Sequence, residues 1–318
     1  MKKVFLSLAI ISAAALLVIS CRKNDTIQNQ ADKYDNFLAT IKSQPQIFTV
    51  NGAAGGTITG KDGTVVTFPA NWAANMDGTS FAGDAIVGLT ESLKKARWIA
   101  DGLTATTKND ILESGGMLDI NVTRKDNGAE LKPATAMTIP SPSLVGVIRA
   151  QVPRNPQITK DLSLFLPDSA SGTTLPPVAW TAPGNFTSIN GPNSYTIQIP
   201  KFRWVNYDVL WNLGATKTTI RVTPLLTALP GTSNLQLLLV YRNISSVITL
   251  PAKTGFFESY ANTIPVGSTA DIVCLGKSDK GQILFTVITA NTFTALQNIS
   301  ITPKVATAAE VKLYLDSL

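Results

Sequence analysis

The amino-acid sequence predicts an all-β protein. We expect two β-sandwich domains joined by a proline-rich, partly stranded middle segment, with a short tether helix near the N-terminus and a short helix at the C-terminus. Three observations support this prediction. Apolar and polar residues alternate over many short stretches, turn-forming residues separate these stretches, and a helical spacing of apolar residues occurs only near the two ends.

The first residues are typical of a secretory signal peptide. Lys2 and Lys3 form a basic start, and no residue from Val4 to Cys21 is charged. The apolar stretch is a little short for a stable transmembrane helix, which needs about 20 apolar residues. We therefore expect residues 1–20 to be a signal peptide, with an uncleaved membrane anchor as the alternative.

The end of this leader carries a second signal. Residues 18–21, Val-Ile-Ser-Cys, resemble the lipobox of bacterial lipoproteins. The resemblance implies that the thiol of Cys21 takes a diacylglycerol and that cleavage leaves Cys21 as the first residue. Because each buried CH₂ group contributes about 0.8 kcal/mol, two or three acyl chains make a stable membrane anchor. Cys21 is the expected lipidation site.

Residues 21–46 are expected to be a polar tether that follows the lipidated cysteine. Four apolar residues in it have the i, i+3, i+4, i+7 spacing of one short amphipathic helix: Tyr34, Phe37, Leu38 and Ile41. Pro45 ends this helix. We interpret the segment as a spacer between membrane and folded body, and a helix packed on the first domain is the alternative.

Residues 47–145 are expected to form the first β-sandwich domain. Residues 117–124 alternate between apolar side chains on one face of a strand and polar side chains on the other. The polar face carries Asp119, Asn121 and Thr123. The Lys-Asp-Asn-Gly sequence at 125–128 follows, and Asn-Gly favours a hairpin turn.

Residues 146–213 contain the densest cluster of proline residues in the chain. Proline is excluded from central strands, so we expect a connector of loops and edge strands here. Residues 214–318 then form the second β domain, in which the apolar run from Leu235 to Tyr241 predicts a strand buried on both faces. A Thr-Ala-Ala-Glu capping box at 307–310 predicts the C-terminal helix.

The composition excludes several classes of site. The chain has no histidine, which removes Ser-His-Asp and Cys-His nucleophile systems and histidine-ligated zinc. With Cys21 acylated, Cys274 has no cysteine partner, and we interpret it as a small buried apolar residue rather than a reactive thiol. The formal net charge of +6 is spread over scattered basic residues. We expect no cofactor, no metal site and no nucleic-acid partner.

A Gly-Gly strand at 55–59, a second strand at 63–70 that ends in Phe-Pro-Ala, and a strand at 85–91 follow one another in the first domain. This order resembles the β-sandwich domain shared by ankyrins, netrin receptors and zonula occludens proteins, over roughly residues 48–142. The resemblance implies the sandwich fold. Some members of that family cleave their own backbone at a His-Phe-Ser type site, and because this chain has no histidine, that activity is not carried over.

A second resemblance covers the whole chain and rests on two further segments. Residues 112–117 read Leu-Glu-Ser-Gly-Gly-Met, and residues 204–208 fit the pattern Trp-(Ile/Val)-Asn-x-Asp. Together with the lipobox, the tether and an immunoglobulin-like last domain, they resemble a group of Bacteroidota envelope lipoproteins that has no established activity. The resemblance implies attachment to the outer membrane, facing the periplasm or the cell surface.

Three sites fit the short Asp-(Ser/Thr)-aliphatic pattern that this phylum O-glycosylates in exported proteins: Thr26, Ser169 and Ser317. Ser169 is the best candidate of the three, because it lies in the proline-rich segment that we expect at the surface. Thr26 falls in the tether and Ser317 at the C-terminus.

The leading hypothesis for the function is a lipid-anchored, non-catalytic envelope or cell-surface protein that acts as a binding or scaffold module. The alternative is a glycan-binding accessory lipoprotein, with Trp204, Tyr207 and Trp211 as ligand-facing aromatic side chains. In a regular strand Trp204 and Tyr207 point to opposite faces, so one continuous platform would need a turn or a bulge. An unknown protein or glycan is the expected partner.

A hydrolase that works without histidine is the least favoured hypothesis. A glycosidase needs two carboxylates about 5–9 Å apart. Glu91 and Glu113 sit near predicted strand ends in the first domain and are the candidates for such a pair. The more conservative reading is that they are solvated carboxylates or hydrogen-bond acceptors in turns.

Overall fold

The computed structural model describes residues 33–134, 146–168, 177–182, 189–212, 214–225 and 234–318. It is mostly β, with 50% of residues in strands and 10% in three short helices, which confirms the predicted all-β fold. The signal peptide, the lipidation site Cys21 and the glycosylation candidates Thr26 and Ser169 lie outside the described residues. Within the described part of the chain, no helix is both long and apolar enough to span a membrane.

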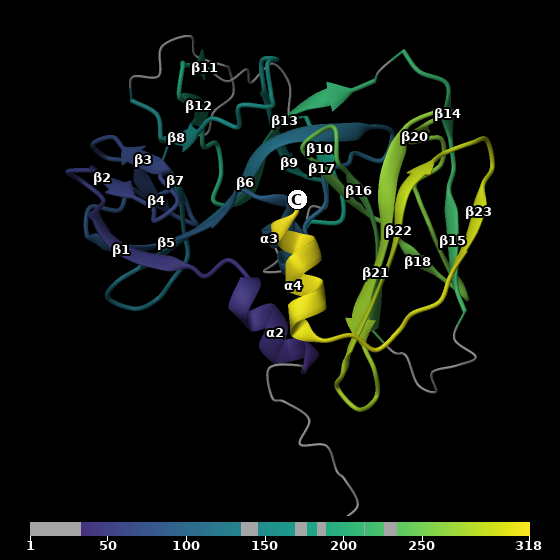
Figure 1. Cartoon of the computed structure of the whole chain (residues 1–318). Helices are drawn as coiled ribbons and strands as arrows, with labels where there is room; N and C mark the ends of the chain where they lie inside the picture. Colours follow the sequence, from purple (N-terminus) through teal and green to yellow (C-terminus); the bar gives the residue numbers. More distant parts are fainter. Residues whose placement is uncertain (1–32, 135–145, 169–176, 183–188, 213, 226–233) are drawn as a thin grey trace, which may run out of the picture.

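The first β unit contains two sheets that share an apolar core (Figure 1). The larger sheet has the order β1 (Gln46–Asn51), β5 (Asp84–Ser92), β6 (Ile111–Arg124), β13 (Arg203–Trp211), β9 (Ser163–Pro167) and β10 (Trp180–Thr181). The smaller sheet has the order β11 (Ile189–Asn190), β12 (Ser194–Gln198), β8 (Arg149–Pro153), β3 (Val65–Phe68) and β2 (Gly56–Thr59). A short pair, β4 (Ala73–Asn75) and β7 (Leu131–Pro133), completes the unit.

The alternation predicted for β6 is present in the structure. Leu118, Ile120 and Val122 are buried in the core between the two sheets. Asp119 and Asn121 belong to the opposite face of the larger sheet, where the side chains are only partly buried. This outer face is central to the site described below.

The structure differs from the predicted boundary at residue 145. Residues 146–213, expected to be a connector, supply β8, β11 and β12 to the smaller sheet and β9, β10 and β13 to the larger one. Where a proline of this segment falls within a strand, it lies at the strand end: Pro153 ends β8 and Pro167 ends β9. They therefore do not interrupt a ladder, and the first unit extends to Trp211.

The second β unit is also built from sheets around one core. One sheet has the order β18 (Ala252–Lys253), β19 (Phe256–Glu258), β15 (Arg221–Pro224) and β23 (Asn298–Ile301), with β15 and β23 parallel. The other has the order β17 (Ser246–Thr249), β16 (Asn234–Tyr241), β21 (Thr269–Lys277) and β22 (Ile283–Thr292). β14 (Lys217–Thr218) pairs with β20 (Ile264–Pro265).

Strand β16 is buried on both faces, as its apolar run predicts. Leu237 and Leu239 belong to the core of the second unit, whereas Leu238 and Val240 belong to a third core between the units. Cys274 lies in the core of the second unit, where burial raises the pKa of its thiol to about 12. That position supports the interpretation of Cys274 as a small buried apolar residue rather than a reactive thiol.

Three helices lie between the two β units: α2 (Tyr34–Ile41), α3 (Lys95–Asp101) and α4 (Ala308–Asp316) (Figure 1). Each contributes buried apolar side chains to the third core. Helix α4 begins with the predicted capping box, in which Thr307 Oγ1 accepts from Glu310 N and Glu310 Oε2 accepts from Thr307 N. Helix α2 has the predicted spacing but packs inside the folded body, which favours the second interpretation of that segment.

Backbone hydrogen bonds join the two units directly. Ala105 N donates to Val247 O at 2.6 Å, and Ser114 N donates to Ser245 O at 2.7 Å. Together with the core shared by all three helices, these bonds place the outer face of the larger sheet against the second unit.

Candidate functional site

Strand β13 sends its three candidate aromatic side chains into three different environments. Tyr207 is fully buried in the core of the first unit, so it does not face a ligand. Trp211 packs against the core of the second unit, with its ring 5.4 Å from that of Tyr241. Trp204 belongs to the core between the units and lines a hollow on the outer face of the larger sheet. The three residues therefore form no common platform.

A bulge does occur in the ladder between β6 and β13, between the pairs Asn206–Met117 and Asp208–Ser114. Two residues of β6, Gly115 and Gly116, lie opposite the single Tyr207 of β13, so the register shifts by one residue and the extra residue belongs to β6. The bulge does not bring the aromatic rings together.

The hollow beside Trp204, which we name the sheet groove, has a volume of about 380 Å³. Its floor is the outer face of β1, β5, β6 and β13, and its rim includes the segment after α2 and the end of α3. Among the side chains that line it are Thr90, Asp101, Asp119, Asn121, Thr123 and Trp204. These polar residues are brought together by register, since Thr90 lies opposite Asp119 and Asp119 lies opposite Trp204.

One charged group that lines the groove has an unused hydrogen-bonding atom. Asp119 Oδ1 is buried and has no hydrogen-bond partner within the described residues, and the same holds for Nε of Arg203, which lies near Asp119 but does not line the groove. Burial raises the pKa of the Asp119 carboxyl, and the nearby charge of Arg203 opposes this. Arg203 also has a φ of 91°, a backbone conformation that is strained for a residue with a side chain.

Gly88 leaves the centre of the groove open. A Cβ atom on Gly88 would lie 3.7 Å from Ile47 Cδ1 and 3.8 Å from Asn121 Cβ, which are ordinary contacts. The groove thus offers hydroxyl, amide and carboxylate groups around an open glycine, next to one indole ring. This combination can bind a ligand that carries hydrogen-bonding groups and an apolar face.

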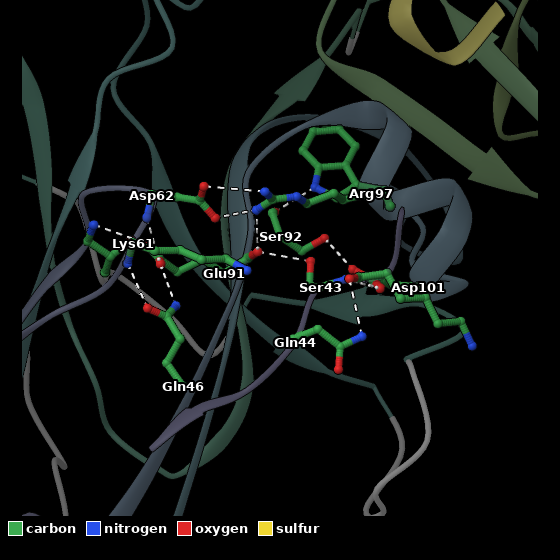
Figure 2. A network of polar contacts seen from close by, with 12 residues as sticks. Ser43, Gln44, Gln46, Lys61, Asp62, Glu91, Ser92, Arg97 and Asp101 are labelled. Atoms are coloured by element: carbon green, nitrogen blue, oxygen red, sulfur yellow. Dashed lines mark hydrogen bonds and ion pairs between the residues drawn. The ribbon is translucent and has the colours of Figure 1, made fainter. Parts of the chain in front are cut away.

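The first of the two candidate catalytic carboxylates is part of a polar network in the first unit (Figure 2). Glu91 is 1% exposed, and its carboxylate accepts hydrogen bonds from Gln46 Nε2, Asp62 N and Thr64 N at 2.9, 3.0 and 2.9 Å. Gly60 provides the space, because a Cβ there would lie 2.3 Å from Glu91 Oε2. Glu91 therefore holds the hairpin turn between β2 and β3.

The same network attaches this turn to helix α3. Arg97 of α3 forms an ion pair with Asp62 and donates to Glu91 O at 3.2 Å (Figure 2). Asp101, at the other end of α3, accepts from Ser43 N at 2.9 Å and from Ser92 Oγ at 2.8 Å. Asp101 lines the sheet groove, whereas Asp62 and Arg97 line a second hollow, so the network forms the wall between the two.

The second candidate carboxylate lies elsewhere on the sheet. Burial raises the pKa of Glu113, and the charge of Lys160 opposes the rise. Glu91 lies opposite Leu118 of β6, five residues further along the strand than Glu113. At about 3.3 Å per residue the two backbone positions are roughly 16 Å apart along the sheet, which puts the side chains beyond the spacing of a glycosidase pair.

The second hollow, which we name the junction cleft, has a volume of about 730 Å³. It lies where α3, the turn between β8 and β9, the turn between β16 and β17, and the end of α4 meet. Its charged lining residues are Asp62, Lys94, Lys95, Arg97, Arg154 and Asp316. The basic pair at 94–95 is visible in the sequence, but only the fold places it beside Arg154.

The two segments that carry the resemblance to the envelope lipoproteins lie opposite each other. Asp208 of β13 pairs with Ser114 of β6, and Asn206 pairs with Met117. Asp208 is fully buried, and its Oδ2 accepts from Asn206 Nδ2 at 2.5 Å. Burial raises the pKa of Asp208 well above its usual range, although the neighbouring Ser114 hydroxyl and the hydrogen bond from Asn206 oppose this.

The remaining glycosylation candidate, Ser317, follows α4. Its hydroxyl donates to Tyr314 O at 2.6 Å and accepts from Arg242 Nη1 at 3.1 Å. The described residues contain no group of three or more histidine, cysteine, aspartate or glutamate side chains that could hold a metal ion.

No protein family matches the chain, and no curated protein matches it.

Proposed function

We propose that this protein is a lipid-anchored, non-catalytic binding module of a bacterial cell envelope, most simply at the outer membrane and facing the periplasm or the cell surface. The leader and the lipobox-like residues 18–21 support the anchor. The sheet groove supports the binding role, and it is the observation on which the proposal depends.

The groove has the features of a ligand site rather than of a packing defect. Asp119 lines the groove, and its Oδ1 oxygen is buried and has no hydrogen-bond partner within the described residues. Leaving such a group unpaired costs about 1–3 kcal/mol. A ligand that donates to Asp119 would recover part of this free energy on binding.

A non-catalytic role agrees with the positions of the two candidate carboxylates. Glu91 accepts three hydrogen bonds that hold a hairpin turn, and Glu113 lies well away from it along β6. Neither residue lines the sheet groove, whose lining carboxylates are Asp101 and Asp119. Asp101 is itself held by Ser43 and Ser92.

A glycan-binding accessory lipoprotein is the second candidate, and Trp204 favours it. The indole of Trp204 lines the groove together with hydroxyl and amide side chains such as Thr90 and Asn121. Sugars stack on aromatic faces through their C–H groups and donate several hydroxyl hydrogens to such polar groups. Of the three aromatic residues in β13, Trp204 alone is in this position.

The substitution Gly88→Val tests the proposal by filling the groove. Its first side-chain atom makes ordinary contacts, and valine suits a strand, so the fold is expected to remain stable. Gly56→Val on β2 is the matched control, because a Cβ there would also make only an ordinary contact, at 3.6 Å with Val50 Cγ1, outside the groove.

Both variants and the wild type are used to capture components from detergent-solubilised envelopes and are run on polysaccharide-retardation gels. We expect a protein or glycan to be bound by the wild type and Gly56→Val but lost with Gly88→Val. Retardation by a polysaccharide selects the glycan-binding candidate. Binding that is the same for all three proteins would place the ligand outside the groove and contradict the proposal.

A further inference from the structure

The junction cleft carries a positive charge that its own acidic residues do not balance. Four cations line it, Lys94, Lys95, Arg97 and Arg154. Arg97 is paired with Asp62, which removes one cation and one anion from the balance. The other acidic side chain of the lining, Asp316, is paired with Lys312 of the same helix.

The hydrogen-bond partners of the remaining cations carry no charge, and Asp271, the acidic residue near Lys95, is itself paired with Arg242. Lys95 is 7% exposed, and its Nζ donates to Tyr241 O at 2.8 Å and to Ile244 O at 3.4 Å. Arg154 donates to Gly191 O at 3.1 Å and to Ile158 O at 3.4 Å. Carbonyl dipoles hold these cations in place without neutralising them.

Two of these cations, Lys95 and Arg154, are also held in place by several contacts, which is the second requirement of a recognition site. The Arg154 guanidinium lies over the Tyr195 ring, 5.6 Å from its centroid. Lys95 is fixed by two carbonyl groups of the second unit while it belongs to α3, so it spans the junction. The exposed Lys94 adjoins it and makes no ion pair within the described residues.

We propose that the junction cleft is a binding site for a small ligand that carries an oxyanion, a carboxylate or a phosphate, recognised by Lys94, Lys95 and Arg154. The volume of about 730 Å³ leaves room for a polar body beyond the anionic group. Asn155 and Ser245, which also line the cleft, can hydrogen-bond to that body. The site is separate from the sheet groove, so it extends the proposed function and does not depend on it.

Saturation-transfer difference NMR on the full-length protein, in a sugar-free zwitterionic detergent, tests the proposal. The probes are glucuronate, glucose 6-phosphate and glucose, measured with the wild type and with Gly88→Val so that the sheet groove cannot contribute. We expect at least one of the two anions to bind to both proteins, and glucose not to bind to Gly88→Val. Binding should weaken as the ionic strength is raised. The anion that binds tells a carboxylate site from a phosphate site.

Two variants locate the binding. Lys94→Gln removes an exposed charge that supports no other contact, and Arg154→Gln removes a guanidinium; each is expected to weaken anion binding by about tenfold. Lys253→Gln, on an exposed residue of β18, is the matched control and should have no effect. Absence of binding by both anions, binding that survives Lys94→Gln and Arg154→Gln, or equal binding of glucose to Gly88→Val would overturn the proposal.

Discussion

The Ser114 hydroxyl donates a hydrogen bond of 2.9 Å to the side-chain oxygen of Asn206. This bond joins β6 to β13 next to the bulge, inside the fold, and both side chains are fully buried. Ser114 N also donates to Ser245 O of the second unit. The two residues thus connect the middle of the larger sheet to the junction between the units.

The neighbouring Asp208 gives this region a pH dependence. Burial raises its pKa in the folded state well above its usual range, whereas the unfolded chain ionises near pH 3.9. Between these two pKa values the folded state binds more protons, so stability falls as pH rises, by up to about 1.4 kcal/mol per pH unit. The substitution Asp208→Asn keeps the shape of the side chain and replaces the titratable carboxyl group by an amide. The variant should therefore be more stable than the wild type at pH about 7.5, and this difference in stability should shrink toward pH about 4.5.

Urea unfolding of both proteins at several pH values measures this difference. The pH dependence that the two proteins share cancels in the comparison. A difference in unfolding free energy that stays constant with pH would show that Asp208 is not protonated in the folded state.

The Glu91 carboxylate is predicted to be a strong contributor to stability. Glu91→Ala leaves Asp62 N and Thr64 N without their acceptor, so we expect a loss of about 2–4 kcal/mol in the free energy of unfolding. Glu258→Ala is the control, because Glu258 forms a partly exposed pair with Arg221, which should contribute at most about 1 kcal/mol. Similar losses in chemical denaturation for the two variants would contradict the role assigned to Glu91.

The first β unit is expected to require residues beyond 145. A fragment of residues 47–145 lacks β8, β12 and β13, which supply Ala150, Tyr195 and Val205 to the core. It should therefore show no near-ultraviolet circular dichroism and no cooperative unfolding. The full chain measured under the same conditions is the control. A fragment that unfolds cooperatively would restore the boundary at 145.

Lipidation can be tested on the two cysteines. Cys21→Ser should abolish incorporation of radiolabelled palmitate and block maturation, because the serine hydroxyl cannot take the diacylglycerol. Cys274→Ala is the control: that thiol is buried in the second unit, and its loss should leave labelling unchanged. Unchanged labelling of Cys21→Ser would exclude the anchor.

Local patterns predict the elements whose residues are close in sequence. The alternation in β6 correctly assigns Leu118 and Ile120 to the core, and the capping box of Thr307 and Glu310 marks the start of α4. No local pattern in the sequence predicts helix α3. It has seven residues and no side-chain cap, and a left-handed Gly102 ends it. Contacts with the rest of the fold, rather than its own pattern, hold it in a helix.

Sequence analysis misses the strand pairing across residue 145 for a related reason. Proline residues suggest a break, but whether a proline lies inside a ladder or at its end depends on the pairing of strands far apart in sequence. The pairing of Asn206 with Met117 carries no local signature. The ladders that β13 forms with β6 and β9 assign it to the first unit.

The candidate site also combines features with a local sequence pattern and features that depend on packing. Alternation predicts the polar face with Asp119 and Asn121, and the sequence marks Trp204 as an aromatic candidate. Their meeting in one groove with Asp101 depends on how α3 packs, so composition cannot reveal it. Burial decides which aromatic side chain of β13 can face a ligand. Tyr207 is aromatic like Trp204, but it is enclosed in the core of the first unit.

The core between the units can form only late in the synthesis of the chain. Leu112, Met117 and Trp204 of the first unit are covered by residues such as Leu238 and Val273, which are synthesised later. Until residues 234–318 emerge, a nearly complete first unit presents a bare apolar surface to its surroundings. The incomplete chain is therefore expected to be prone to aggregation through this apolar surface. Rapid completion of the chain, or a chaperone that binds the exposed surface, would prevent self-association.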